Sequence, residues 1–251
     1  MRVLVTGASK GIGLEFVRQY ASAGHHVIAT CRAPCEAAEL RSVANEFPRV
    51  DLAQLDVTAD EDISEIAKRL RGDRLDLLVN NAGQYGYLST SLADLDRDEW
   101  LRMFDVNCIG PARLTGALLP ALRLSSRAQV VGISSVKASI ERNAMGAFYA
   151  YRSSKSGLNA VLRSLAIDLQ EDRISVFALS PGWVDRGSKP MTGIDLRERL
   201  ARAKRWRAEF GDFSARQGLT DAVGGMIVLL ERLTFADSGG FFDHLGHPLP
   251  W

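Results

Sequence analysis

The sequence has few cysteines and no excess of charge of either sign, and both absences narrow the class of protein. It contains 3 cysteines, an odd number, with no repeated Cys-x-x-Cys spacing. This usage indicates free thiols in a reducing compartment rather than a disulfide framework or a zinc site, and we expect no metal. Lysine and arginine number 31 against 30 acidic residues. Bulk charge therefore gives no sign of a nucleic acid or an anionic membrane as partner.

Long apolar runs are also lacking. No segment approaches the roughly 18 apolar residues of a transmembrane helix, and the first apolar run, Val3–Val5, is too short for a signal peptide. We therefore expect a cytoplasmic protein. Its 251 residues, 46% of them hydrophobic, suffice for a sizeable core. The whole chain, 1–251, is predicted to form a single domain.

Short β-branched runs alternate with longer helical patterns along most of the chain. Seven segments are predicted as strands: Val3–Val5, Val27–Thr30, Leu52–Val57, Leu75–Val79, Gln129–Ser134, Ser175–Ser180 and Gly239–Asp243. Helical periodicity is visible in Ile12–Ala23, Glu61–Leu70, Glu99–Leu122, Ser153–Leu169 and, after a predicted cap at Thr220-Asp221, in Val223–Leu233. This alternation predicts an α/β fold, a parallel sheet with helices on both faces.

The segment 182–218 breaks this alternation. A helical pattern from about Asp195 to Phe210 carries six cations, at Arg197, Arg199, Arg202, Lys204, Arg205 and Arg207. One interpretation is a solvated helix face with ion pairs to Glu198 and Glu209. The other is a substrate lid, residues 186–212, whose cations meet an acidic substrate or the phosphates of a cofactor.

A glycine-rich turn follows the first predicted strand and precedes the first predicted helix. It reads Thr6-Gly7-Ala8-Ser9-Lys10-Gly11-Ile12-Gly13, with the spacing Gly-x-x-x-Gly-x-Gly. Glycines there allow a tight turn, so that amides at the start of the helix can face a pyrophosphate. The turn predicts a nucleotide site at Gly7, Ser9, Lys10, Gly11, Ile12 and Gly13.

Tyr151 and Lys155 lie four residues apart, a spacing that on a helix places both side chains on one face. A lysine ammonium there would lower the pKa of the phenol from its usual value of about 10. Such a phenol is a useful proton donor to a carbonyl oxygen that receives a hydride. The spacing alone is weak evidence, because helices produce it by chance, and its weight comes from the motifs upstream.

With these two features, four further motifs resemble the short-chain dehydrogenase/reductase family over essentially the whole length. They are Asn80-Asn81-Ala82-Gly83 after a strand, Asn107 in a helix, Ser134-Ser135 at a strand end and Pro181-Gly182 after the sixth strand. Tyr149–Asn159 and the ending Gly240–Trp251 resemble the C-factor-like carbonyl reductase branch. The resemblance implies a Rossmann-like, doubly wound seven-stranded sheet. It also implies an oxidoreductase that reduces a ketone or aldehyde, or oxidises a secondary alcohol.

The resemblance assigns roles to individual residues. Tyr151 would be the general acid or base, Lys155 would hold the nicotinamide ribose, Ser135 would bind the substrate oxygen, and Asn107 would anchor a relay water. Further cofactor contacts are implied at Asp56, Val57, Asn80, Ala82, Gly83, Pro181, Gly182 and Val184. Alternatives remain, because Tyr149 rivals Tyr151, Ser134 rivals Ser135, Asn107 could bend or cap a helix, and Asn80 and Asn81 could satisfy buried backbone groups.

Two positions depart from the family's pattern. Ser135 precedes Tyr151 by 16 residues, a longer separation than is usual in the family, and Arg186 stands where a threonine often binds the nicotinamide amide. The loops 84–98, 136–148 and 186–212 are expected to shape the substrate pocket. Their aromatic and apolar members favour an apolar ligand: Tyr85, Tyr87, Met145, Phe148 and Met191, together with Trp183 just before the last loop.

The end of the second strand favours NADP(H) over NAD(H). An NAD enzyme normally places an acidic residue there, whereas this chain has Cys31 followed by Arg32. Arg32 can bind a 2′-phosphate with a fork of donors, and Lys10 can add a second cation. The alternative is that both are ordinary surface residues and the pocket accepts either cofactor.

The family also implies a homodimer or homotetramer, formed through the helices in Glu99–Leu122 and Tyr151–Leu169, with the tail Phe241–Trp251 at another interface. A second function remains open beside the reductase, namely a nicotinamide-binding regulatory protein with little turnover.

Overall fold

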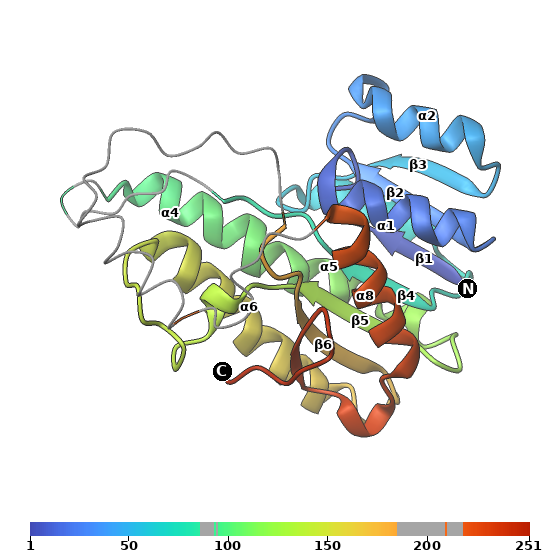
Figure 1. The fold of residues 1–251 in the computed structure, drawn as a ribbon. Helices are drawn as coiled ribbons and strands as arrows, with labels where there is room; N and C mark the ends of the chain where they lie inside the picture. The colour runs from blue at the N-terminus through green and yellow to red at the C-terminus, as the bar shows by residue number, and fades with distance from the viewer. Residues whose placement is uncertain (86–92, 94, 185–208, 210–217) are drawn as a thin grey trace.

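Seven parallel strands form one sheet in the order β3-β2-β1-β4-β5-β6-β7, in a computed structural model that describes residues 1–85, 93, 95–184, 209 and 218–251. The strands are β1 (Arg2–Val5), β2 (His26–Cys31), β3 (Val50–Gln54), β4 (Leu77–Asn80), β5 (Gln129–Ile133), β6 (Ser175–Ser180) and β7 (Phe241–Asp243). The predicted α/β fold with a Rossmann-like, seven-stranded parallel sheet is therefore confirmed (Figure 1).

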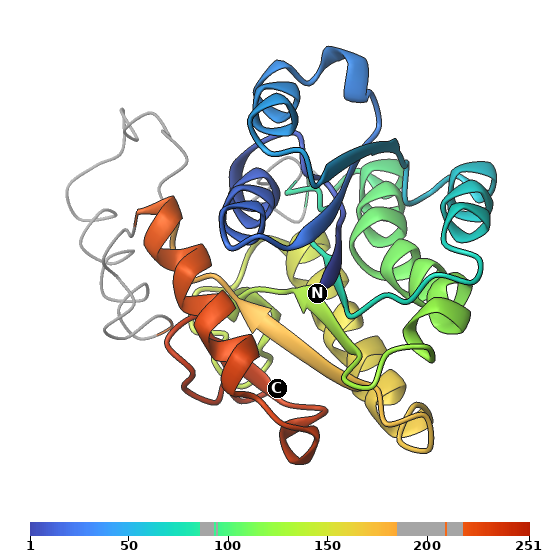
Figure 2. The ribbon, with the colours of Figure 1, turned by 90° about the vertical axis from the view of Figure 1, so that its right-hand side faces the viewer.

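Helices cover both faces of this sheet (Figure 2). Those described are α1 (Gly11–Ser22), α2 (Ala38–Glu46), α3 (Asp60–Arg69), α4 (Arg97–Phe104), α5 (Gly110–Leu122), α6 (Tyr149–Asp168) and α8 (Leu219–Arg232). The alternation of side chains along a strand produces two separate cores. In β1, Val3 and Val5 join a core with α1 and α8, whereas Leu4 joins the core under α3, α5 and α6.

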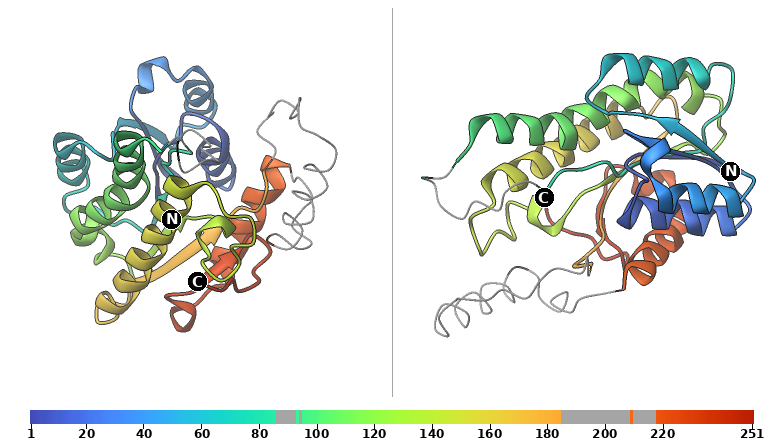
Figure 3. Two further views of the ribbon diagram at one scale, coloured as in Figure 1. Left: turned by 90° about the vertical axis from the view of Figure 1, so that its left-hand side faces the viewer. Right: turned by 90° about the horizontal axis from the view of Figure 1, so that it is seen from above.

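The predicted helix Glu99–Leu122 is interrupted. A wider π-helical turn, Asp105–Ile109, separates α4 from α5, and the two helices follow one another alongside α6 (Figure 3). Such turns occur frequently at functional sites, and this one contains the buried Asn107. The interpretation of Asn107 as a helix-bending residue is therefore consistent with its position in the structure.

The predicted cap of the last helix is wrong by two residues. Gly218 is the N-cap of α8, so Thr220 and Asp221 already lie in its first turn. The reason is that a carboxylate at the third helical position also stabilises the positive end of the helix. A Cβ on Gly218 would lie 3.1 Å from Asp221 Oδ2, so the acid reaches back over the cap.

The direction of the crossover changes between β1 and β4, because β2 and β3 extend the sheet on one side and β5 to β7 on the other. In open parallel sheets, ligands bind at such a switch point, beyond the carboxyl ends of the strands. The glycine turn after β1 and the Asn80–Gly83 segment after β4 meet there. Over the residues that the structure describes, no helix combines the length and apolar character of a membrane span.

Candidate active site

The glycine turn is held in place by the chain that follows β4. Asn81 Nδ2 donates hydrogen bonds to the carbonyls of Thr6 (2.8 Å) and Gly7 (3.2 Å). In return, Thr6 Oγ1 accepts the backbone amides of Asn81 (3.0 Å) and Ala82 (2.9 Å). A Cβ on Gly13 would lie 2.4 Å from both Gly7 O and Asn81 Nδ2. The glycine is therefore required for the first turn of α1 to pack against the loop.

The N-terminus of α1 is not capped by a side chain of its own N-cap residue. Lys10 is its N-cap residue without a side-chain hydrogen bond to the cap, and no acidic residue occupies the first turn. Gly11 has φ +58°, and a Cβ there would stand in open space. The amides of an uncapped helix N-terminus can donate to a phosphate group, and the glycine leaves room for that group to approach the backbone. Ser9 and Ile12 lie in the same turn, half-buried and buried respectively.

The end of β2 lies against this turn, because Ala8 N donates to Thr30 O (2.9 Å). Cys31 is buried, and burial raises the pKa of its thiol, whereas Arg32 and Lys10 are both exposed. The expected position of the acid thus holds a neutral thiol, followed by an exposed guanidinium. This set of residues fits a 2′-phosphate better than a free ribose hydroxyl pair.

Asp56 and Val57 follow β3 at the same edge of the sheet. Asp56 Oδ1 accepts from the amide (2.9 Å) and hydroxyl (2.8 Å) of Thr58, which fixes the turn. Val57 is buried, and Gly110 at the start of α5 packs on it: a Cβ there would be 2.8 Å from Val57 O. Both predicted cofactor contacts are thus held in fixed positions.

Asn80 ends β4 with its side chain buried, and its Nδ2 donates to Thr115 Oγ1 (3.3 Å). Its Oδ1 has no hydrogen-bond partner among the described residues. Asn81, by contrast, satisfies backbone carbonyls, as the alternative interpretation proposed. Thr6, the first residue of the glycine turn, joins the two loops through its hydroxyl, a role that the sequence motifs did not indicate.

Ser134 and Ser135 differ sharply in their surroundings. Ser134 is buried and donates to Asn159 Oδ1 (2.6 Å), inside the core beneath α6. Ser135 is half-buried, directly after β5, and its Oγ accepts the amide of Lys137 (3.2 Å). An accepting hydroxyl still has its proton to donate, so Ser135 is the serine of the pair that is available to a substrate oxygen.

Asn107 connects the π-helical turn to the first turns of α6. Its Oδ1 accepts from Gln84 N (2.7 Å), and its Nδ2 donates to Gln84 O (2.8 Å) and Ser154 Oγ (3.0 Å). Ser154 Oγ in turn donates to Tyr151 O (2.9 Å). The amide thereby fixes the position of the turn that carries Tyr151, and one lone pair of its Oδ1 remains for a water.

Lys155 is buried, and its Nζ donates to Ile133 O (2.7 Å) at the end of β5. A Cβ on Gly83 would lie 3.6 Å from this nitrogen and 3.3 Å from Asn107 Oδ1, so the three residues meet at one place. Tyr151, one turn earlier on α6, is half-buried. Its ring packs edge-on against Tyr85, with centroids 4.4 Å apart, so an aromatic residue of loop 84–98 reaches the site.

Pro181 and Gly182 follow β6, with Pro181 buried and Gly182 at φ +72°. Gly182 N donates to Ser180 Oγ (3.4 Å), which also accepts Val136 N (3.1 Å) from the segment after Ser135. Val184 is buried in the core with α1 and α8, so only its backbone is available to a cofactor. Arg186, Tyr87, Met191 and the basic pattern 195–207 lie outside the described residues.

Two apolar members of the expected substrate pocket have other contacts. Met145 packs on the core under α6, and the Phe148 ring lies beneath Lys137 Nζ, 4.1 Å from the ring centroid. Trp183 is half-buried. Among the described residues, Tyr85 is the clearest apolar neighbour of Tyr151. No group of three or more His, Cys, Asp or Glu side chains in the described part of the chain could hold a metal ion.

Comparison with known proteins gives consistent results. A family model described as short chain dehydrogenase matches residues 1–192. C-signal of Myxococcus xanthus is 34% identical over 177 residues, which cover 70% of this chain and 93% of that protein. The NADPH-bound carbonyl reductase from chicken fatty liver is 31% identical, with a TM-score of 0.84 over 100% of this chain and 98% of that one. A carbonyl reductase from Pseudomonas aeruginosa PAO1 in complex with NADP is 26% identical, with a TM-score of 0.79 over 100% and 99% of the two chains.

Proposed function

The chain belongs to the short-chain dehydrogenase/reductase family of oxidoreductases, and on that premise we propose that it is an NADP(H)-dependent reductase of ketones or aldehydes, reversible on secondary alcohols. The predicted family is confirmed, as is its C-factor-like carbonyl reductase branch. The observation that carries the proposal is a pair of links at the carboxyl edge of the sheet: Asn107 is joined through Ser154 to the turn of α6 that carries Tyr151, and Lys155 is bonded to the end of β5, two residues before Ser135. The uncapped glycine turn lies at the same edge.

Each of these side chains has a separate task in the proposed reaction. The cofactor, when bound, supplies the hydride. The Ser135 hydroxyl donates to the substrate oxygen and orients it, and the Tyr151 hydroxyl gives that oxygen a proton as charge develops on it. The Lys155 ammonium, fixed by Ile133 O, stabilises the phenolate that remains and holds the cofactor ribose. Asn107 fixes the first turns of α6. The remaining lone pair of its Oδ1 can hold a water through which the Tyr151 phenolate regains its proton.

The proposed preference for NADP(H) rests on Lys10 and Arg32. Both are exposed cations at the switch point, and the neutral Cys31 thiol stands where a carboxylate would repel a 2′-phosphate. NADPH or NADP bound to two similar carbonyl reductases supports the same choice.

Arg32→Ala is expected to weaken NADPH binding by about 10- to 100-fold, the value of one or two charge-assisted hydrogen bonds to phosphate. NADH affinity should be unchanged, because NADH lacks the 2′-phosphate. Quenching of tryptophan fluorescence, titrated with each nucleotide, measures both constants. Arg18→Ala, an exposed arginine in the second half of α1, is the matched control. An equal loss of affinity for NADPH and NADH in Arg32→Ala would show that the guanidinium does not bind the 2′-phosphate.

Ser135→Ala is expected to lower kcat for carbonyl reduction by about 10²-fold, the usual cost of one donor to a developing oxyanion. Ser134→Ala removes the buried bond to Asn159 instead, so it should lower the free energy of unfolding by about 1 to 2 kcal/mol and leave kcat unchanged. Steady-state kinetics and urea unfolding of both variants separate the two effects. The opposite pattern, with kcat lost in Ser134→Ala, would exchange the roles of the two serines.

We propose association through α4 and α6. These helices pack on each other, and α4 leaves Leu101 exposed beside a largely apolar pocket lined by Leu95, Trp100, Phe104 and Ser153. Sedimentation velocity distinguishes a monomer from the homodimer or homotetramer that the family suggests.

A further inference from the structure

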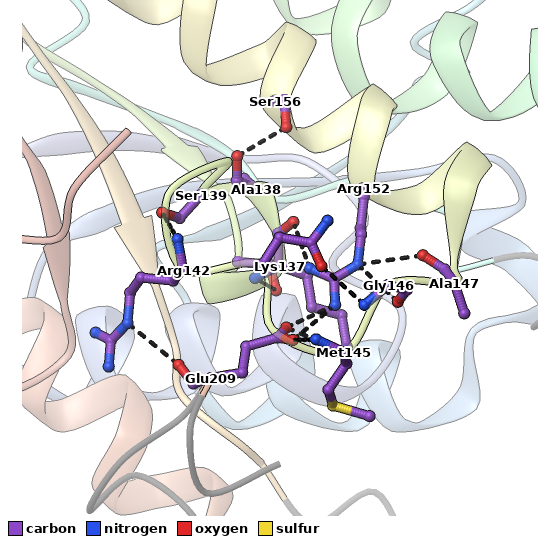
Figure 4. Close-up of polar contacts among 12 residues, drawn as sticks. Lys137, Ala138, Ser139, Arg142, Met145, Gly146, Ala147, Arg152, Ser156 and Glu209 are labelled. Atoms are coloured by element: carbon purple, nitrogen blue, oxygen red, sulfur yellow. Dashed lines mark hydrogen bonds and ion pairs between the residues drawn. The ribbon is translucent and has the colours of Figure 1, made fainter. Parts of the chain in front are cut away.

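Glu209 places a fully buried carboxylate against the loop 136–148, which separates Ser135 from Tyr151 (Figure 4). Both of its oxygens accept from Arg152 Nη2, at 2.7 and 2.9 Å. Oε2 also accepts the amide of Met145 (3.0 Å), and Lys137 Nζ lies 3.8 Å from Oε1. Among the described residues, the partners of Glu209 come from the loop and from α6, whereas the cations of its own helical pattern lie outside the described residues.

Arg152 extends this contact to both ends of the loop. Its Nε donates to Gly146 O (3.3 Å) and Ala147 O (3.2 Å), and its Nη1 donates to Lys137 O (3.4 Å). Arg152 directly follows Tyr151, and Lys137 comes two residues after Ser135. The guanidinium thus joins the two chain segments that carry the proposed acid and the proposed oxygen-binding serine.

The end of the loop needs such support. Gly146, Ala147 and Phe148 have φ of 65°, 54° and 54°, three successive left-handed residues before α6 begins at Tyr149. Ala and Phe adopt this region only when the surrounding contacts impose it. Of the three carbonyls that Arg152 binds, two belong to these residues, Gly146 and Ala147.

Glu209 supplies the negative charge that balances two buried cations, Arg152 and Lys137. Arg152 and Lys137 are both buried, at 7% and 5% exposure, and Glu209 supplies the anion that faces them among the described residues. Burial lowers the pKa of Lys137 to about 8, Glu209 opposes this shift, and Arg152 adds to it. Without the carboxylate, two buried cations would face each other, so Lys137 would have to lose its proton or one of the two side chains would have to move.

We propose that Glu209 is a positioning residue for the reaction: by holding Arg152 and Lys137, it sets loop 136–148 so that Ser135 and Tyr151 reach one substrate oxygen. The proposal rests on the reductase function proposed above. It also gives the long separation of Ser135 and Tyr151 a physical role, because the loop that makes up this separation is the segment that Glu209 and Arg152 bind.

Glu209→Gln tests the proposal, since the amide keeps the size of the side chain and one acceptor but removes its charge. We expect kcat with NADPH and an aromatic carbonyl panel, benzaldehyde and acetophenone among them, to fall by about 10- to 100-fold, the effect of a small displacement of reacting groups. NADPH affinity should be unchanged, because the glycine turn lies on other elements. Unchanged kcat in folded Glu209→Gln would overturn the proposal.

Two further variants separate positioning from general destabilisation. Glu209→Gln combined with Lys137→Met removes one buried cation together with the anion, so we expect kcat to recover at least in part. Asp172→Asn removes a carboxylate from another paired arginine, Arg123, on the surface beyond the end of α6, and should leave kcat unchanged. If the double variant were no better than Glu209→Gln, charge balance at the loop would not be the cause.

Hydrogen exchange of the loop amides gives a readout that does not depend on turnover. Met145 N is bonded to Glu209, and Gly146 N lies in the turn that Arg152 holds. In Glu209→Gln, exchange should rise in peptides that cover 137–149 and stay unchanged in α1. If the natural protein reduced no carbonyl, the proposed function would fail, whereas unchanged exchange in the loop would refute the role of Glu209 by itself.

Discussion

Tyr151→Phe is expected to lower kcat for carbonyl reduction by about 10³-fold, the contribution of a well-placed general acid. Phenylalanine keeps the ring and its edge-on contact with Tyr85, so the packing of these two rings is retained. NADPH affinity should be nearly unchanged, because Lys155 remains bonded to Ile133 O and the glycine turn is untouched. Steady-state kinetics with NADPH and a carbonyl substrate, with NADPH titration alongside, measures both quantities.

Tyr149→Phe is the matched control, since Tyr149 is also half-buried in the first turn of α6. It lacks a lysine four residues on, the position taken by Ser153. We expect its kcat to equal that of the natural protein. A loss in Tyr149→Phe as large as in Tyr151→Phe would mean that the first turn of α6 matters only for its packing.

Gly13→Ala is expected to abolish measurable NADPH binding and to destabilise the fold by about 1 to 3 kcal/mol, the cost of overpacking a fixed site. The new methyl group would lie 2.4 Å from Gly7 O and from Asn81 Nδ2. Both atoms belong to the bonds that hold the turn, so relief of the clash must displace Asn81 or the turn itself. Urea unfolding gives the stability, and NADPH titration gives the binding.

Gly116→Ala provides the contrast. Gly116 also lies in a helix, but a Cβ there has no neighbour within 4 Å and the residue is exposed. Alanine should stabilise this variant by up to about 1 kcal/mol through helix propensity. A free energy of unfolding that falls in Gly13→Ala and rises in Gly116→Ala would support the close packing of the glycine turn. A Gly13→Ala variant that is more stable and still binds NADPH would contradict it.

The sheet could be predicted from the sequence because its buried strands are short β-branched runs bounded by turns. All seven predicted strands overlap observed ones, although β3 ends at Gln54 rather than Val57. Leu55 and Val57 continue the apolar pattern after the strand pairing stops, since both fill the core under α3. Helix α2 was missed, because only Leu40 and Val43 of its nine residues are buried, too few for a periodic signal.

The site was predictable where short-range motifs carry it. The glycine turn, Asn80–Gly83 and Ser134-Ser135 all lie at predicted strand ends, and Lys155 lies on the predicted helix Ser153–Leu169. Tyr151 precedes the start of that predicted helix, whereas α6 begins earlier, at Tyr149. The choice between the two serines needed the structure, because only the position of Asn159 shows which hydroxyl is buried. Glu209 could not be found from sequence, since its partners are 57 and more residues away along the chain. In the sequence, an acid that follows six cations is most simply interpreted as a partner for them.

The transfer of a deuteride is the most direct test of the reductase claim. The purified protein would be mixed with the benzaldehyde and acetophenone panel and with NADPH in which both hydrogens at C4 of the nicotinamide ring are replaced by deuterium. Mass spectrometry of the alcohol products then detects the label. Our account predicts one deuterium in the product, formed by the natural protein and lost in Tyr151→Phe. Tight NADPH binding without labelled alcohol from any member of a broad carbonyl panel would contradict it and favour a nucleotide-binding regulator.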